Sequence, residues 1–302
     1  MDAPLLSRRD WLSSSGVVLA AAALGVSGRN TSDTTAAELV SNALGGYRFL
    51  PGVPALSFGV VAADGFEIVR TTFRQPRPFP AAMADIEQML RASGRPIHAL
   101  CALELSSPRS LSRAQFNSFN QAYVARLEQS SLLIGNQVPL ARTNVAFARA
   151  DAAAGEPGVD VHAFSYTVPA TSRSRGAAPT FVTAGMPEIR NLQKTALRLE
   201  PPDIVAANDT TPEGQPTLTA LRLKTEFILT ALDETMRTLG VQWTHVTGVQ
   251  LYTVHDVQPL LSDLILPRIG AAARLGIEWH HMYPPGVRVE IGVRGTHREL
   301  VA

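Results

Sequence analysis

The chain has 302 residues, with 27 Lys and Arg side chains, 26 Asp and Glu side chains and a formal net charge of +1. That length is enough for two domains of common size, each with its own hydrophobic core. A nearly neutral, mixed charge provides no electrostatic footprint for nucleic acid or an anionic membrane, so we expect a small-molecule ligand. The single cysteine, Cys101, excludes an intramolecular disulfide framework.

The first 30 residues have the pattern of an export signal. Residues 7–12, SRRDWL, precede an apolar stretch over 17–28. A basic segment before a short apolar segment is typical of a signal peptide and is too short for an ordinary membrane span. The paired arginines resemble the motif of the twin-arginine (Tat) pathway, which exports folded proteins. We predict that residues 1–30 bind the Tat export machinery and that the mature protein is periplasmic; a Sec signal or an uncleaved anchor is the alternative.

Strands and helices alternate through the first half of the mature chain, residues 45–170. Asp64-Gly65 separates two β-rich runs, which favours a hairpin between them. Apolar residues at helical spacing predict a helix around 83–90, which Gly94 ends. The remaining predicted elements of this half are a strand over 97–105, a helix over about 112–132, and strands near 143–147 and 159–168.

The second half, residues 178–298, repeats this order after a linker over 170–179. The loop over 186–217 is unusually long, which fits either a functional loop or a surface ornament. Each half is predicted to be α+β, with helices on one face of a mixed sheet. The predicted elements are a strand over 181–184, a helix over 218–239 ended by Gly240, a strand over 246–254, a shorter helix over 260–273, and strands over 277–282 and 287–293.

Four short segments resemble the RidA/YjgF (reactive intermediate deaminase) family. In the first half they are residues 116–123, FNSFNQAY, and residues 139–145, PLARTNV. In the second half they are residues 182–187, VTAGMP, and residues 287–291, VRVEI. Their order matches the order of the predicted elements over nearly all of the mature chain. The resemblance implies two tandem RidA-like domains, also described as chorismate-mutase-like, at 45–170 and 178–298.

The resemblance also implies a set of site residues. In the family an arginine grips a substrate carboxylate, and a glutamate lies near the water that hydrolyses an enamine or imine. These positions fall on Arg142 and Glu290, the family's asparagine falls on Asn120, and its backbone turn falls on Ala184 and Gly185. A guanidinium matches a carboxylate bidentately, and a carboxyl group can steer or deprotonate water.

Each half keeps only part of this set. His162 takes the glutamate position in the first half. In the second half the arginine position falls on Leu275, or on Arg274 if one gap is allowed, and one residue of register changes the face of a strand. Because the losses are complementary, we predict one composite site that joins Arg142 and Asn120 with Glu290 and the backbone at 184–185.

Glu278 and His280 form a second polar pair, since alternate strand residues share a face. One interpretation is a metal site completed by His255 or Glu290. The other is a polar wall of the substrate cleft, in which Glu278 contacts the substrate and His280 acts as an acid or base. We adopt the second and therefore predict no metal.

The sequence thus predicts a hydrolase or deaminase that needs no cofactor and acts on a small, carboxylate-bearing enamine, imine or related unsaturated compound. Arg142, Glu290 and His280 are the predicted catalytic residues, with Arg274 among the substrate contacts. Two alternatives stay open: an enol-ether hydrolase similar to the chorismatases, which look similar in carrying two RidA-like halves, and a non-catalytic binding protein. Family members form trimers with clefts between subunits, so the resemblance implies a trimeric or pseudo-trimeric homo-oligomer.

Overall fold

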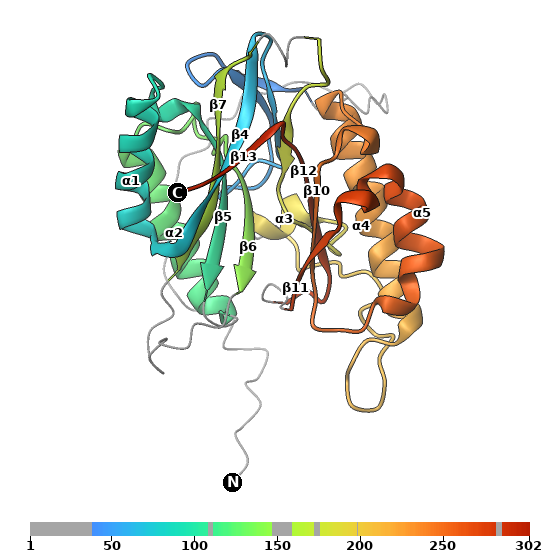
Figure 1. The fold of residues 1–302 in the computed structure, drawn as a ribbon. Coiled ribbons are helices and arrows are strands. Elements are labelled where there is room, and N and C mark those ends of the chain that lie inside the picture. Colours follow the sequence, from blue (N-terminus) through green and yellow to red (C-terminus); the bar gives the residue numbers. More distant parts are fainter. Residues whose placement is uncertain (1–37, 108–110, 147–158, 172–175, 198, 282–285) are drawn as a thin grey trace, which may run out of the picture. The chain divides into compact units, whose positions relative to one another are not determined.

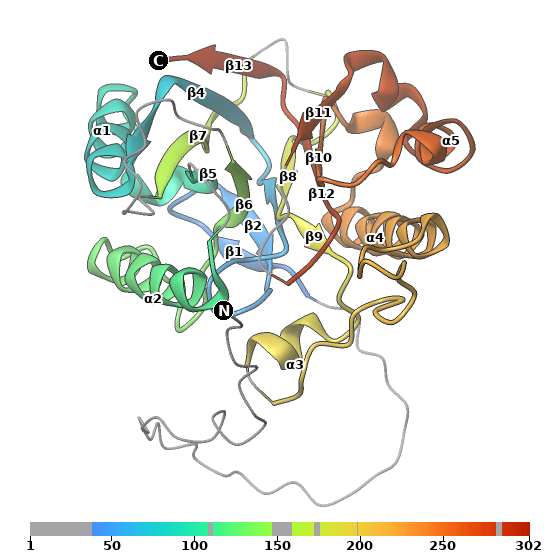
Figure 2. The ribbon, with the colours of Figure 1, turned by 90° about the horizontal axis from the view of Figure 1, so that it is seen from below.

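The computed structural model describes residues 38–107, 111–146, 159–171, 176–197, 199–281 and 286–302. Residues 36–302 form one compact unit, in which two sheets face each other and helices cover their outer faces (Figure 1 and Figure 2). The predicted α+β class is confirmed. The predicted signal segment lies outside the described residues. In the described ranges, no helix combines the length and apolar character that a membrane crossing requires.

The larger sheet has the strand order β1-β2-β3-β8-β12-β10-β11, with β9 beside β12. Neighbouring strands are antiparallel except β10 and β11, which are parallel. The strands are β1 (Val40–Asn42), β2 (Tyr47–Leu50), β3 (Gly59–Ala62), β8 (Phe181–Thr183), β9 (Met186–Pro187), β10 (Gly248–Tyr252), β11 (Ile277–His280) and β12 (Glu290–Gly295).

The smaller sheet has the order β13-β4-β7-β5-β6. Its outer pairs, β13 with β4 and β5 with β6, are parallel, and its inner pairs are antiparallel. The strands are β4 (Phe66–Pro78), β5 (Leu100–Ser107), β6 (Ala141–Ala146), β7 (Asp160–Pro169) and β13 (Arg298–Val301).

The two halves share one topology. The first runs β4, α1 (Phe79–Ala92), β5, α2 (Arg113–Gln129), β6 and β7, and the second runs β8, α4 (Leu218–Leu239), β10, α5 (Leu266–Ile269), β11 and β12. In both, the first strand pairs the fourth, the fourth pairs the second, and the second pairs the third in parallel. The two sheets also exchange strands. The N-terminal strands β1–β3 belong to the larger sheet, which the second half builds, and the C-terminal strand β13 belongs to the smaller sheet, which the first half builds. The division into domains at 45–170 and 178–298 stays a prediction.

Capping residues fix the helix ends that frame the site. Ser112 and Gln115 form a capping box at the start of α2, and the Thr217 side chain accepts from the Ala220 N–H at the start of α4. Gly240 ends α4 in the left-handed conformation that glycine favours. The apolar face of α4 packs on the larger sheet, while α1 and α2 pack on the smaller one. Each fully buried large side chain stabilises this packing by about 1.5–3 kcal/mol.

A third apolar cluster lies between the two sheets. It joins Tyr47, Phe49 and Val60 of the larger sheet to Ile68 of the smaller one, and the Tyr47 hydroxyl donates to the Leu100 carbonyl at 3.1 Å. Cys101 belongs to this cluster, and burial raises the pKa of its thiol. The cysteine is therefore a buried apolar side chain.

The predicted hairpin at Asp64-Gly65 is wrong. The turn itself forms, because the Phe66 N–H donates to the Ala63 carbonyl at 3.0 Å and Gly65 has a φ of 81°. However, the strands on either side of this turn do not pair, because β3 belongs to the larger sheet and β4 to the smaller one. The strands β1, β2 and β13 were also not predicted, and the loop over 186–217 contains β9 and a short helix, α3 (Leu192–Ala196).

Candidate active site

Arg142 lies on the edge strand β6, against the inner face of α2. Its Nη2 donates to the Asn120 Oδ1 at 2.8 Å, and its guanidinium carbon is 4.8 Å from the centroid of the Tyr123 ring. The rings of Phe116 and Phe119 are 5.7 and 5.8 Å away. These four α2 residues are spaced 3, 1 and 3 apart in the sequence, which puts them on one face of the helix. An aromatic wall and one amide thus orient the arginine.

The Arg142 guanidinium is buried but incompletely paired. Only 3% of the residue is exposed, and its Nε and Nη1 have no hydrogen-bond partner among the described residues. Burial lowers the pKa of Arg142, while the charges of Tyr123 and Glu290 act in the opposite direction. Buried donors are normally satisfied, so the open Nε–H and Nη1–H groups of this guanidinium favour an anionic partner such as a carboxylate.

Glu290 is the first residue of β12 and pairs in register with Tyr252 on β10 and Pro187 on β9. Burial, reinforced by the negative charge of Glu188 and opposed by Arg142, raises the pKa of Glu290 to about 8. At neutral pH this carboxyl group therefore carries a proton. A protonated, buried carboxyl group is equipped to act as a general acid.

Gly185 joins the arginine strand to the glutamate. Its N–H donates to the Arg142 carbonyl at 3.2 Å, while the N–H of Ala184 donates to the Phe58 carbonyl at 2.9 Å. A Cβ at residue 185 would lie 1.7 Å from the Glu290 Oε1, so only glycine leaves room for the carboxyl group. The structure thus brings together Arg142, Asn120, Glu290 and Gly185, the set expected for the composite site.

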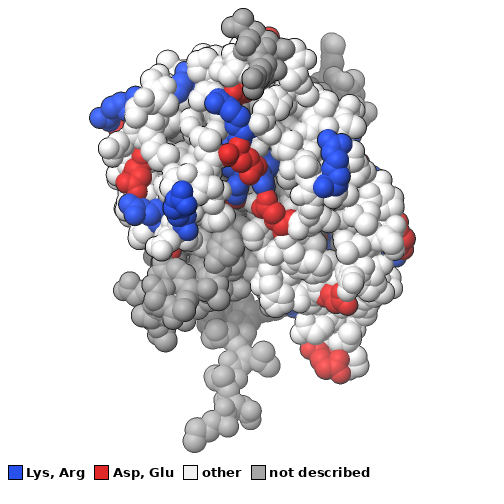
Figure 3. Space-filling view, viewed as in Figure 1, with Lys and Arg blue, Asp and Glu red and all other residues white. Residues whose placement is uncertain are grey.

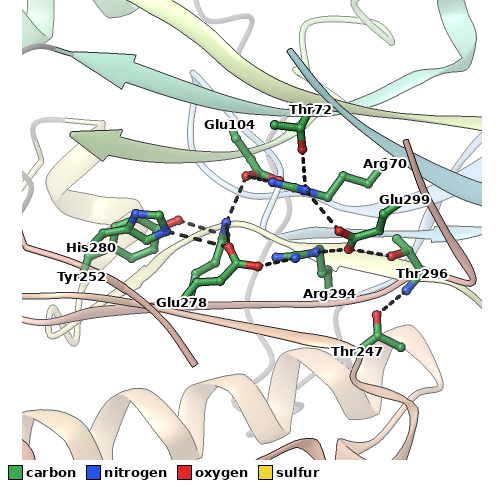
Figure 4. Close-up of polar contacts among 11 residues, drawn as sticks. Arg70, Thr72, Glu104, Thr247, Tyr252, Glu278, His280, Arg294, Thr296 and Glu299 are labelled. Carbon is green, nitrogen blue, oxygen red and sulfur yellow. Dashed lines mark hydrogen bonds and ion pairs between the residues drawn. The ribbon is translucent and has the colours of Figure 1, made fainter. Parts of the chain in front are cut away.

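Glu278 and His280 belong to a neighbouring network instead (Figure 4). The imidazole of His280 stacks on the Tyr252 ring with 4.7 Å between the centroids, and burial lowers its pKa. The Tyr252 hydroxyl donates to the Gln250 Oε1 at 2.9 Å, and Tyr252 is the register partner of Glu290. Tyr252 therefore lies between this network and the Arg142–Glu290 site.

The network links the two sheets through buried charges. Arg70 of the smaller sheet donates to both Glu104 oxygens, at 2.5 and 2.8 Å, and Gln250 of the larger sheet donates to Glu104 at 3.0 Å. Arg294 pairs with Glu278 and, at 2.8 Å, with Glu299 of β13. On the face seen in Figure 3, acidic and basic side chains gather over β13. The C-terminal strand therefore completes a charge bridge between the sheets.

Replacing Glu104 by Gln is expected to lower the free energy of unfolding by about 3 kcal/mol, because it leaves the buried Arg70 underpaired. Burial alone would raise the pKa of Glu104, but Arg70 outweighs it and brings the pKa down to about 2. The contribution is therefore present above the usual glutamate pKa and is lost as the pH falls toward 2. Urea unfolding at several pH values measures it, with Glu87→Gln on the exposed face of α1 as control. Equal stabilities of Glu104→Gln and wild type at pH 7 would contradict this role.

The remaining predicted residues lie elsewhere or change role. Arg274 is exposed on the 3-10 segment Gly270–Leu275, and no described hydrogen bond or ion pair connects it to Arg142 or Glu290. His162, at the glutamate position of the first half, lies near Glu104, and burial lowers its pKa. No group of three or more His, Cys, Asp and Glu side chains placed to hold a metal occurs among the described residues.

Sequence reasoning missed Glu104 and Gln250, which lie inside predicted apolar strands, and Arg294, which lies one residue beyond the strand predicted over 287–293. A signal was present, because polar residues alternate with apolar ones in Val249-Gln250-Leu251-Tyr252 and in Leu103-Glu104-Leu105. Alternation inside an otherwise apolar strand indicates a second buried face that is polar. Glu188 was also missed, since it lies in the loop over 186–217.

Comparison with known proteins decides the family. The model of the family described as 2-aminomuconate deaminase CnbZ matches residues 39–300. The chain belongs to this family. A curated 2-amino-5-chloromuconate deaminase from Comamonas testosteroni is 36% identical over 265 residues, which cover 85% of this chain and 96% of that protein. The CnbZ family match includes both Arg142 and Glu290, and it supports a deaminase that acts on a carboxylate-bearing unsaturated compound.

Proposed function

We propose that this protein deaminates a dicarboxylated enamine of the 2-aminomuconate type. One observation carries the proposal: the buried Arg142 keeps two N–H groups without a described partner, and it lies close enough to Glu290 to oppose the burial that raises the pKa of that carboxyl group to about 8. An anion receptor next to a buried acid fits an amino acid substrate with a conjugated double bond. The relative from Comamonas testosteroni has a substrate of this type in its name.

Each residue has one role in the proposed reaction. Arg142 binds the carboxylate next to the amino-bearing carbon, and Asn120 holds the guanidinium in place through its Nη2. Glu290 donates its proton to the neighbouring alkene carbon, which turns the enamine into an iminium and leaves Glu290 ionised. Water adds to the iminium carbon and returns a proton to Glu290, and the resulting carbinolamine releases ammonia, so one enamine and one water give one 2-oxo acid and one ammonia. Neither a redox step nor a cofactor enters this balance.

Gly185→Ala is expected to lower kcat/KM by about a hundredfold, because the new Cβ occupies the place of the Glu290 carboxyl group and displaces it by about 1 Å or more. Gly292→Ala is the matched control on β12, since its Cβ would meet the Thr143 methyl group at 3.3 Å and would approach the Gln250 Oε1 and the Gly185 Cα only to an ordinary contact distance of 3.8 Å. Steady-state kinetics of both variants measures the difference. Similar activities of Gly185→Ala and Gly292→Ala would show that the approach of Gly185 to Glu290 has no catalytic role.

A substrate panel tests the proposed reaction against its alternatives. Carboxylated enamines, imines and enol ethers are incubated with the protein while absorbance and ammonia are followed. Ammonia release from dicarboxylated enamines supports the proposal. Cleavage of an enol ether without ammonia would favour a chorismatase-like hydrolase. Thermal stabilisation by these compounds without turnover would favour a binding protein.

Three wider proposals accompany the reaction. Both halves have the RidA/YjgF fold, for which the repeated strand order and the four sequence segments are the support. The protein assembles as a trimeric or pseudo-trimeric homo-oligomer, which light scattering tests. It is exported to the periplasm through Arg8 and Arg9, so cell fractionation should find the protein retained in the cytoplasm after both are changed to Lys.

A further inference from the structure

Glu188 is a fully buried residue directly after β9, and its side chain contacts the backbone that leads into β12, the strand of Glu290. Its Oε1 accepts the N–H of Arg288 at 2.6 Å, and its Oε2 accepts the N–H of Val289 at 3.0 Å. Pro187, the preceding residue, is the register partner of Glu290. Both carboxylate oxygens thus hold the backbone immediately before Glu290, which fixes where β12 begins.

Lys224 on α4 is the cation that accompanies Glu188. Its Nζ is 3.4 Å from the Glu188 Oε1 and donates to the Val205 carbonyl at 2.6 Å, and the two side chains are 3% and 0% exposed. The Val205 N–H in turn donates to the Glu188 carbonyl at 3.0 Å. The loop over 186–217 is therefore tied at its base to α4 and to the start of β12.

A buried ion pair is poor evidence for stability, since desolvation costs about as much as the pairing gains. Its location suggests a different role. The charged and titratable groups that act on Glu290 come from three elements: Arg142 on β6, Tyr252 on β10, and Glu188 after β9, which is itself paired with Lys224. Arg288 and His255 also belong to this surrounding, since burial and the charges of Arg288 and Lys224 lower the pKa of His255. Within this set Glu188 is the acidic residue whose side chain hydrogen-bonds to the backbone immediately before Glu290.

We propose that Glu188 is a positioning residue for Glu290: its two backbone hydrogen bonds hold Glu290 in register, and its charge, partly offset by Lys224, acts on the Glu290 carboxyl group. This inference rests on the proposed role of Glu290 as the acid. The inference gives the 186–217 loop a function in the reaction, because this loop carries Glu188, which influences the protonation of Glu290.

Two neutral variants should move the titration of Glu290 in opposite directions. Glu188→Gln removes a negative charge, so the pKa of Glu290 falls by roughly one unit and the basic limb of the kcat profile moves to lower pH. Lys224→Gln removes a positive charge and leaves both oxygens of Glu188 on the backbone, so the limb moves to higher pH. Carboxyl ¹³C NMR of the free protein, with the Glu290 signal assigned from Glu290→Gln, gives the same pKa without turnover.

Opposite shifts in the two variants are the expected result, and the Lys224→Gln shift isolates charge from backbone positioning. Shifts in the same direction, or no shift in either, would overturn the inference. The NMR titration separates this test from that of the proposed function. Opposite NMR shifts in a protein that releases no ammonia would sink only the function, whereas ammonia release with unmoved titrations would sink only the inference.

Discussion

Glu290→Gln is expected to lower kcat by roughly 10²- to 10⁴-fold, the usual contribution of a positioned general acid. The amide has nearly the shape of the protonated carboxyl group but has no acidic proton to donate, so substrate binding should change little. Steady-state kinetics with 2-aminomuconate measures the loss. Glu226→Gln, on the exposed face of α4, is the control and should keep wild-type rates.

The pH dependence of kcat shows whether Glu290 acts in its protonated or its ionised form. Because the active form of Glu290 is protonated and its pKa is about 8, kcat should be level near neutral pH and fall as the pH rises above about 8. A profile that rises through pH 8 would show that the ionised carboxylate is the active form. In that case Glu290 would act as a base toward water rather than as the acid.

Arg142→Lys and Arg142→Ala are both expected to lower kcat/KM by about 10²- to 10⁴-fold, chiefly by raising KM. Two charge-assisted hydrogen bonds to a carboxylate are worth about 1.5–3 kcal/mol each, and lysine cannot supply the paired geometry. Arg48→Ala is the matched control, because Arg48 is an exposed arginine on β2. The kinetic constants of the three variants are compared with those of wild type.

A second readout keeps loss of binding apart from loss of folding. Thermal unfolding is measured with and without a dicarboxylate that resembles the proposed 2-oxo acid product. This ligand should raise the unfolding temperature of wild type and Arg48→Ala, and should not raise that of either Arg142 variant. If Arg142→Ala is stabilised as strongly as wild type, the substrate carboxylate binds elsewhere.

Helices were the most predictable part of this fold, because their signals are local. Gly94 and Gly240 end α1 and α4 as expected. The predicted helix α2 also forms, and its Asn120 accepts a hydrogen bond from Arg142. Strand pairing was less predictable, since it depends on partners far away in the chain. Asp64-Gly65 determines a turn, but β3 pairs with β2 and β8 while β4 pairs with β7 and β13.

The composite site was predicted from a family resemblance, because each half of the chain lacks the site residues that the other half keeps. In the structure, Gly185 contacts both the Arg142 backbone and the Glu290 carboxyl group. The electrostatics did not follow from sequence. The protonation of Glu290 depends on burial and on Glu188, and the charge bridge through Glu104 depends on two sheets facing each other. Both features depend on distances between elements of the two halves. The periodicity of residues along one strand gives no information about those distances.

The most direct measurement is the ammonia formed per molecule of 2-aminomuconate consumed by the purified protein. We expect a ratio of one, with the rate lost in Glu290→Gln and Arg142→Ala and kept in Glu226→Gln and Arg48→Ala. Consumption at an undiminished rate in the Glu290 and Arg142 variants, or consumption without ammonia, would contradict a deaminase site built from these two residues.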